Sequence, residues 1–84
     1  MRITLKLYAS LADYLPPEAR KGNQLPLELR ENTTIADVLS QQLLPPQLCH
    51  LVLVNGVFIP PRERATHPLQ QNDEVAIWPP VAGG

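Results

Sequence analysis

From residue 51 to residue 59 the chain reads Leu-Val-Leu-Val-Asn-Gly-Val-Phe-Ile, and this stretch decides how the remainder is interpreted. Leu51–Val54 is a dense apolar run, which is typical of a strand buried on both faces. Asn55-Gly56 favours a type I′ turn, because both of its central positions need positive φ. Val57–Ile59 then returns as a short strand, which Pro60-Pro61 ends. The stretch therefore predicts a tight β-hairpin.

The segment before the hairpin has the periodicity of a helix. Thr34 is a good N-cap residue, and Asp37, three positions later, makes a weaker form of the capping box. Pro45 ends the helix, so we expect it over about residues 35–43. Its apolar residues recur at i, i+3, i+4 and i+8 and form one face: Ile35, Val38, Leu39 and Leu43.

Strands are predicted at both ends of the chain and ahead of the helix. Residues 2–8 and residues 25–30 alternate apolar and polar side chains, and Pro26 favours an edge position for the second segment. The last strand covers Glu74–Trp78. The predicted order is ββαβββ, which describes an α+β domain whose mixed four- to five-stranded sheet has one main helix across it.

The connections between these elements are short and contain proline or charged residues. Ser10 is expected to cap a short helix across Leu11–Leu15, and Pro16-Pro17 stops that helix. Residues 18–23 are expected to form a charged surface loop, and residues 62–70 an irregular segment.

Length and composition indicate the number of domains, the kinds of partner and the location of the protein. The 84 residues are expected to form one domain, residues 1–84, with residues 79–84 as an extended C-terminal tail. A net charge of −1 with scattered basic residues predicts no nucleic-acid partner and no anionic membrane partner. The strand pattern directly after Met1 predicts no signal peptide, and no apolar run is long enough to span a bilayer, so we expect a cytoplasmic protein.

A few residues suggest chemistry but have a plainer interpretation. Cys49 and His50 are neighbours on an extended segment, so their side chains point to opposite faces and form no nucleophile–base pair. Cys49 is expected to be a small buried hydrophobe. With only His50 and His67, no metal site is expected. Asp73 is expected to shape a turn rather than to serve as an acid or base.

The end of the chain is its most unusual feature. Gly83 and Gly84 have no Cβ and allow another backbone to approach closely. Pro79 and Pro80 stiffen the exit from the last strand and remove two amide donors. Six extended residues reach about 20 Å, which is enough to deliver a carboxylate into the active site of another protein.

The chain resembles the MoaD/ThiS sulfur-carrier family, which has the ubiquitin-like β-grasp fold. The resemblance covers essentially the whole chain, and the tail is closest to that of the small subunit of molybdopterin synthase. Two features depart from the usual pattern: Trp78 stands where phenylalanine is usual, and residues 15–20 replace a short arginine-containing helix end. The segments that carry the resemblance are Thr33–Leu39, Leu53–Gly56, Asn72–Ala76 and the Pro-Pro-Val-Ala-Gly-Gly of residues 79–84.

The resemblance implies a chemistry in which this chain is not catalytic alone and binds no cofactor. An E1-like adenylating enzyme uses ATP to activate the Gly84 carboxylate, and a sulfur donor protein then leaves a thiocarboxylate there. The tail next enters the large subunit of molybdopterin synthase, where its sulfur contributes to the dithiolene of the molybdenum cofactor. Gly83 lets the arm fit a narrow channel, and Pro79 and Pro80 lower the entropy cost of ordering it.

Several alternatives remain open. The chain could instead supply sulfur to thiamine, to a tungsten cofactor or to another thiolation pathway. It could also be a ubiquitin-like modifier, whose Gly84 forms an isopeptide bond, or a non-covalent interaction module. In each case Phe58 and Trp78 are candidate contact residues, since Trp78 is expected to face opposite to Val75 and Ile77. The binding residues expected with them are Pro79, Pro80, Val81 and Ala82.

Overall fold

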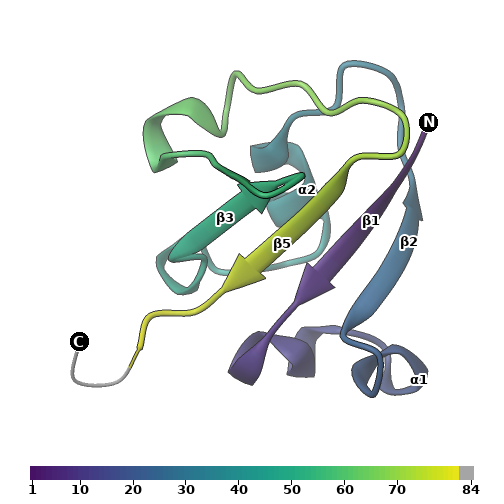
Figure 1. Cartoon of the computed structure of the whole chain (residues 1–84), viewed down its shortest axis with the longest axis vertical. Coiled ribbons are helices and arrows are strands. Elements are labelled where there is room, and N and C mark those ends of the chain that lie inside the picture. The colour runs from purple at the N-terminus through teal and green to yellow at the C-terminus, as the bar shows by residue number, and fades with distance from the viewer. Residues whose placement is uncertain (82–84) are drawn as a thin grey trace.

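A computed structural model describes residues 1–81, and within them five strands form one mixed sheet in the order β2-β1-β5-β3-β4 (Figure 1). The two central strands, β1 and β5, run parallel, and every other neighbouring pair is antiparallel. The predicted mixed sheet and the element order are therefore confirmed, and Pro26 lies on the edge strand β2. The strands are β1 (Arg2–Leu7), β2 (Gln24–Glu28), β3 (Leu51–Val54), β4 (Val57–Phe58) and β5 (Glu74–Trp78).

The helix α2 (Ile35–Gln41) crosses one face of this sheet and lies behind it in Figure 1. Its first turn carries the predicted capping box. The Asp37 amide donates to the Thr34 hydroxyl at 3.2 Å, and the Thr34 amide donates to the Asp37 carboxylate at 3.0 Å. These two bonds satisfy backbone donors that a helix start otherwise leaves unpaired.

The helix ends earlier than residue 43, and the expectation that Leu43 belongs to the apolar face is wrong. Leu43 takes a left-handed conformation with φ 57°, and its side chain is 81% exposed. The Leu44 amide reaches back to the Leu39 carbonyl at 2.9 Å, and the Leu43 amide to that of Ser40 at 3.1 Å. This pair of bonds is a Schellman motif, which ends the helix and returns Leu44 to the core.

The core lies between α2 and the sheet and is built from one face of β1, β2, β3 and β5, whereas both residues of β4 are exposed. In β3, Val52 and Val54 are buried, whereas Leu51 and Leu53 are half-buried on the other face. The prediction that this strand is buried on both faces is therefore wrong, because α2 covers only one of them. The main core residues from strands and helix are Ile3, Leu5, Leu7, Ile35, Val38, Leu39, Val52, Val54, Val75 and Ile77.

The β3–β4 hairpin has the predicted turn. Asn55 and Gly56 have φ of 51° and 83°, as a type I′ turn requires. The Asn55 side-chain amide donates to the Asp73 carboxylate at 2.8 Å, and the same carboxylate accepts the Gln70 amide at 2.8 Å. Asp73 therefore shapes its own turn, as expected, and also fastens the hairpin turn beside it.

The connections contain more helical turns than the sequence indicates. Where Ser10 was expected to cap a helix, the 3₁₀ helix η1 (Ala9–Tyr14) begins after Tyr8, without any side-chain cap. The expected loop at 18–23 begins instead inside α1 (Pro17–Arg20), since a proline suits the first turn of a helix. Two further 3₁₀ turns are η2 (Pro46–Leu48) and η3 (Pro61–Glu63), the latter at the start of the segment expected to be irregular.

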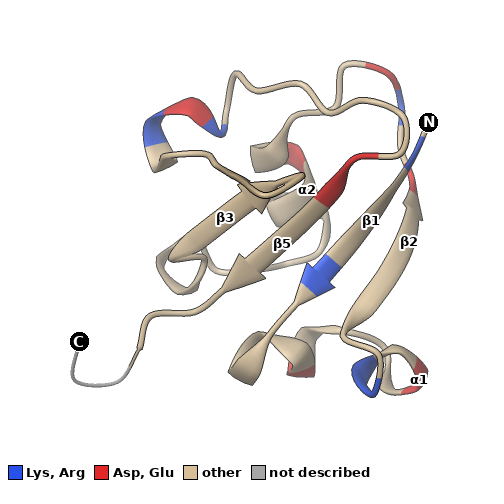
Figure 2. Ribbon diagram, viewed as in Figure 1, with Lys and Arg blue, Asp and Glu red and all other residues tan. Residues whose placement is uncertain are grey.

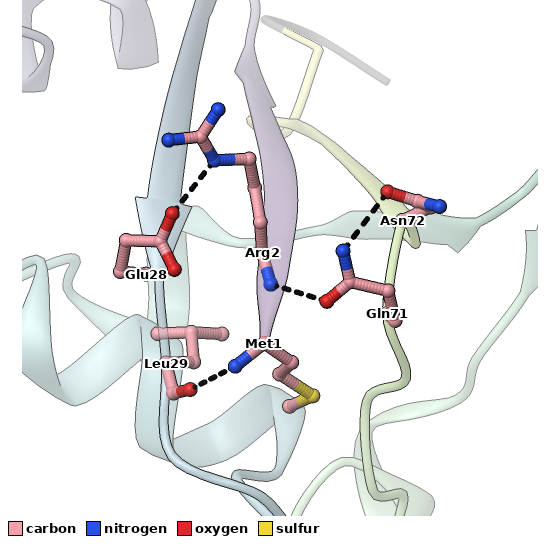
Figure 3. A network of polar contacts seen from close by, with 6 residues as sticks. All are labelled: Met1, Arg2, Glu28, Leu29, Gln71 and Asn72. Carbon is pink, nitrogen blue, oxygen red and sulfur yellow. Dashed lines mark hydrogen bonds and ion pairs between the residues drawn. The ribbon is translucent and has the colours of Figure 1, made fainter.

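A polar network holds the start of β1 to its neighbours (Figure 3). The Met1 ammonium donates to the Leu29 carbonyl at 2.7 Å, and Arg2 pairs with Glu28 at 2.7 Å. The Arg2 amide also donates to the Gln71 side chain at 2.8 Å. The two bonds of Arg2 are exposed and contribute little stability each, but together with the part-buried Met1 bond they fix the register at one end of the sheet. Because β5 runs parallel to β1, the tail leaves from the other end.

Candidate functional site

The face of the sheet that α2 leaves uncovered is largely apolar near the tail. Residues directly opposite one another in a ladder share a face. Leu51 lies opposite Trp78, and Leu53 lies opposite both Ala76 and Phe58. Their neighbours Val52 and Ile77 point into the core, so these side chains point outward. We call this surface the outer face; its apolar residues are Tyr8, Leu51, Leu53, Phe58, Ala76 and Trp78.

Two ion pairs lie on the outer face, Arg2 with Glu28 and Lys6 with Glu74. The Lys6 ammonium is 3.0 Å from the Glu74 carboxylate, and this hydrogen bond raises the pKa of Lys6. Lys6 lies near the end of β1 and Glu74 begins β5. In Figure 2 these strand segments are blue and red, whereas β3 and the remainder of β5 carry no charged residue. The surface therefore combines apolar side chains with charge pairs, one of which includes the three-donor ammonium of Lys6.

The tail leaves the sheet at Trp78, where several contacts meet. The Trp78 indole stacks on the Tyr8 ring, with centroids 4.4 Å apart and an angle of 11° between the planes. The Trp78 carbonyl accepts the His50 amide at 3.1 Å, and the Ile77 carbonyl accepts the Tyr8 amide at 3.1 Å. The next two residues are prolines and have no amide to donate, so ladder bonding cannot continue through them.

The structure brings most of the described candidate residues together at this exit. Pro79 is half-buried, Pro80 is exposed, and Val81 is 76% exposed. Trp78 lies on the face opposite to Val75 and Ile77, as alternation predicts. The proposed contacts at Ala82, Gly83 and Gly84 lie outside the described residues. A hollow of about 480 Å³ runs between tail and body; it is lined by Ala9, Ser10, His50, Leu51, Trp78, Pro79, Pro80 and Val81.

Phe58 lies at the far side of the outer face, on β4, and is 49% exposed. Leu51 and Leu53 connect it to Trp78 across β3. Sequence reasoning missed these leucines and Tyr8 as parts of the surface. Tyr8 had a usable signal, because the alternation of residues 2–8 puts it on the same side as Lys6. Only the strand register shows that Leu51 and Leu53 lie between Phe58 and Trp78, which the sequence indicated as contact residues.

The other residues that suggested chemistry have structural roles. Cys49 is 2% exposed, and its thiol donates to the Pro45 carbonyl at 3.5 Å. Burial raises the pKa of the Cys49 thiol, and the nearby Arg64 opposes this shift only in part. Among residues 1–81, no three His, Cys, Asp or Glu side chains gather where they could hold a metal ion. In the same range, no helix is long and apolar enough to cross a membrane.

Arg64 lines a second hollow, of about 590 Å³, between the end of α2 and the η2 and η3 turns. Its guanidinium donates to the carbonyls of Cys49 at 2.7 Å, His50 at 3.2 Å and Ile59 at 3.3 Å. Burial lowers the pKa of Arg64 from its usual value. The Arg64 guanidinium thus holds the loop after β4 against the residues that precede β3. The other residues that line this hollow are mainly apolar.

These features define a class of protein. A mixed sheet with a parallel central pair, one helix across a single face and a chain end leaving the last strand constitute the ubiquitin-like β-grasp fold. The HVO 2177 protein of Haloferax volcanii has this fold, with a TM-score of 0.76 and 23% identity over 100% of this chain and 87% of that one. Small archaeal modifier protein 1 of Methanosarcina acetivorans is similar at a TM-score of 0.67 and 27% identity, over 99% and 96%.

A third solved structure is the complex of subunits 1 and 2 of molybdopterin-converting factor from Helicobacter pylori. One of its chains matches at a TM-score of 0.60 and 16% identity, over 100% of both chains. No curated protein sequence matches this chain. The model of the ThiS family matches residues 9–84. The chain therefore belongs to the ThiS family, the ThiS/MoaD group of ubiquitin-like sulfur carriers and modifiers.

Proposed function

We propose that this chain is a sulfur carrier that donates sulfur in molybdenum cofactor biosynthesis, as the small subunit of a molybdopterin synthase. The observation that carries the proposal is the exit at Trp78, where ladder bonding ends on an apolar face and an exposed, proline-stiffened arm begins. The family match extends through Gly83 and Gly84 at the end of this arm. Those glycines leave the terminal carboxylate accessible to a narrow active site.

The proposed chemistry takes place in two steps at Gly84. Its carboxylate attacks the α-phosphorus of ATP on an E1-like adenylating enzyme, which releases pyrophosphate and forms an acyl-adenylate. A hydrosulfide-level sulfur nucleophile from a donor protein then attacks the acyl carbon. The carbon–oxygen bond to AMP breaks, AMP leaves, and a thiocarboxylate remains. The chain itself supplies no acid, base or metal ligand, and ATP belongs to the activating partner.

The outer face is the proposed docking surface for both partners, with Phe58 and Trp78 as its principal contacts. Apolar and aromatic side chains of this kind are enriched at the centres of interfaces. The Helicobacter pylori complex of two converting-factor subunits supports a large-subunit partner for this chain. One surface would then serve the adenylating enzyme and the large subunit in turn, in the cytoplasm.

A second candidate function is covalent modification of proteins. The likeness to small archaeal modifier protein 1 of Methanosarcina acetivorans favours it, at 27% identity over 99% of this chain. In that case the activated Gly84 would acylate a lysine amine and release AMP. Sulfur delivery to thiamine, to a tungsten cofactor or to another thiolation pathway would use the same activation. The proline-proline-valine lead at residues 79–81 favours the molybdopterin subunit.

The test is accurate-mass analysis of the C-terminal peptide from chain produced together with its adenylating enzyme and sulfur donor. Peptide analysis is needed because oxidation of Met1 or Cys49 adds nearly the same mass to the whole protein as exchange of oxygen for sulfur. Sulfur on Gly84 is the expected result, and a chain lacking Gly84 is the control. An unmodified carboxylate with high-mass conjugates that need Gly84 would instead indicate a modifier.

A further inference from the structure

We propose that Tyr8 is a positioning residue for the tail: its ring, stacked on Trp78, sets the direction in which the tail leaves the sheet. This inference rests on the proposed sulfur-carrier function and deepens it. It assigns to Tyr8 an effect on delivery of the carboxylate that is separate from any contact with a partner. The central observation is the nearly parallel stack of the two rings, 4.4 Å apart.

Tyr8 is itself held firmly. Its backbone is extended, with φ −116° and ψ 161°, and its amide continues the β1–β5 ladder by donating to the Ile77 carbonyl at 3.1 Å. Its carbonyl accepts the Leu11 amide at 3.1 Å, which closes the first turn of η1. Ala9 then adopts φ 53°, an unfavourable left-handed conformation for alanine. This sharp turn leads the chain away into η1 while the Tyr8 ring stays over Trp78.

The tail has few other constraints at its root. The His50 amide holds the Trp78 carbonyl at 3.1 Å, but Pro79 and Pro80 donate no hydrogen bond. Proline fixes φ, and Pro79 precedes a second proline that also holds its ψ extended, so the direction of the arm depends on the conformation at Trp78. The ring stack limits the rotamer of Trp78 and, through it, the backbone angles from which Pro79 starts.

Positioning and simple contact predict different kinetics. A residue that only contacts the partner contributes equally to the bound ground state and the transition state, so its loss raises KM alone. A residue that orients the arm reduces the entropy lost when the carboxylate meets ATP, so its loss lowers kcat. Tyr8 should therefore affect kcat for adenylation.

The experiment compares the wild-type full-length chain with Tyr8→Ala, Tyr8→Leu and Tyr8→Phe in adenylation by its E1-like enzyme. Tyr14→Ala is the matched control, since Tyr14 is the other tyrosine and lies 41% exposed on η1. We expect Tyr8→Ala and Tyr8→Leu to lower kcat about threefold to tenfold, in addition to any rise in KM from the contact surface that they remove. Tyr8→Phe keeps the stack and should retain wild-type kcat, as should Tyr14→Ala.

Near-ultraviolet circular dichroism gives an independent reading, because Trp78 is the only tryptophan. Its signal should fall in Tyr8→Ala and Tyr8→Leu and persist in Tyr8→Phe. Tyr8→Leu preserves apolar cover, so it keeps the test decisive if Tyr8→Ala does not fold. A rise in KM alone, or an unchanged kcat, would overturn the positioning role, while adenylation of the wild type would still uphold the activation step that the proposed function requires. A wild-type chain that is not adenylated would overturn both.

Discussion

At the scale of single residues, Cys49 shows how burial determines the chemistry of a side chain. The thiol lies among core residues at 2% exposure and points to the Pro45 carbonyl. Desolvation disfavours the thiolate, which is the nucleophilic form, and so raises the pKa of Cys49. Cys49 is therefore unsuited to hold the sulfur that this chain is proposed to carry.

We predict that the Cys49 thiol reacts slowly with iodoacetamide in the native chain and rapidly in denaturant, as mass spectrometry would measure. The raised folded pKa also links the thiol to stability. The contribution of the protonated Cys49 thiol to the free energy of unfolding is fully present below the pKa of this thiol in the unfolded chain. It is lost as pH rises through the pKa of the thiol in the folded chain. Alkaline unfolding should therefore accompany faster alkylation. Equal rates with and without denaturant at neutral pH would contradict the burial of this thiol.

Local chemistry made some residues predictable, and tertiary packing hid others. Asn55-Gly56 and the Thr34–Asp37 pair acted as expected, because turn and cap geometry depend on adjacent residues alone. Leu43 did not, because its periodic position is overridden by the turn that returns Leu44 to the core. Alternation places Tyr8 on the same face as Lys6, but its stack on Trp78, which is distant in sequence, follows only from the tertiary structure.

At the scale of elements, α2 depends on its ends. It spans only Ile35–Gln41, and isolated helices of this length are unstable in water. Packing of Ile35, Val38 and Leu39 against the sheet supplies most of its stability, while the capping box and the Schellman motif satisfy its terminal backbone groups. Removal of the Thr34 hydroxyl oxygen alone should therefore change the free energy of unfolding measurably.

We predict that Thr34→Ala lowers the free energy of unfolding by about 1 kcal/mol, because the Asp37 amide loses its acceptor. For a chain of this size, that corresponds to a fall in Tm of roughly 4–8 °C, measured by thermal unfolding. Ser40→Ala is the matched control on the exposed side of the same helix, and its effect should stay within about 0.5 kcal/mol. Equal effects of the two substitutions would show that the cap contributes nothing.

The sequence predicted the strands and the main helix better than it predicted how they meet. Alternation located β1, β2 and β5 and explains which side chains enter the core. It carries no information about strand order, so the parallel pairing of β1 with β5 was not predicted and follows from the structure. The short turns α1 and η3 were missed, since each follows a proline in a segment without periodicity.

At the scale of the whole molecule, the fold separates three tasks. One face of the sheet packs against α2 and gives stability, the outer face presents Phe58 and Trp78, and the end of β5 presents the tail. The sequence indicated both aromatic residues and the tail as candidate contacts. It could not show that Leu51 and Leu53 join them into one surface, because that depends on the register of β3 with β4 and β5.

This separation predicts that the tail can be altered without cost to the fold. Deletion of Gly84 should change the free energy of unfolding by less than about 0.5 kcal/mol, because β5 ends at Trp78 and the core lies wholly before it. The same deletion should abolish sulfur transfer, measured as thiocarboxylate formation and as cofactor produced with the large subunit. A chain extended by one alanine after Gly84 is the matched control for length, and it should also fold normally and carry no sulfur. Cofactor synthesis by the truncated chain would contradict the assignment of Gly84 as the sulfur-bearing residue, whereas loss of stability would show that the terminus packs on the fold.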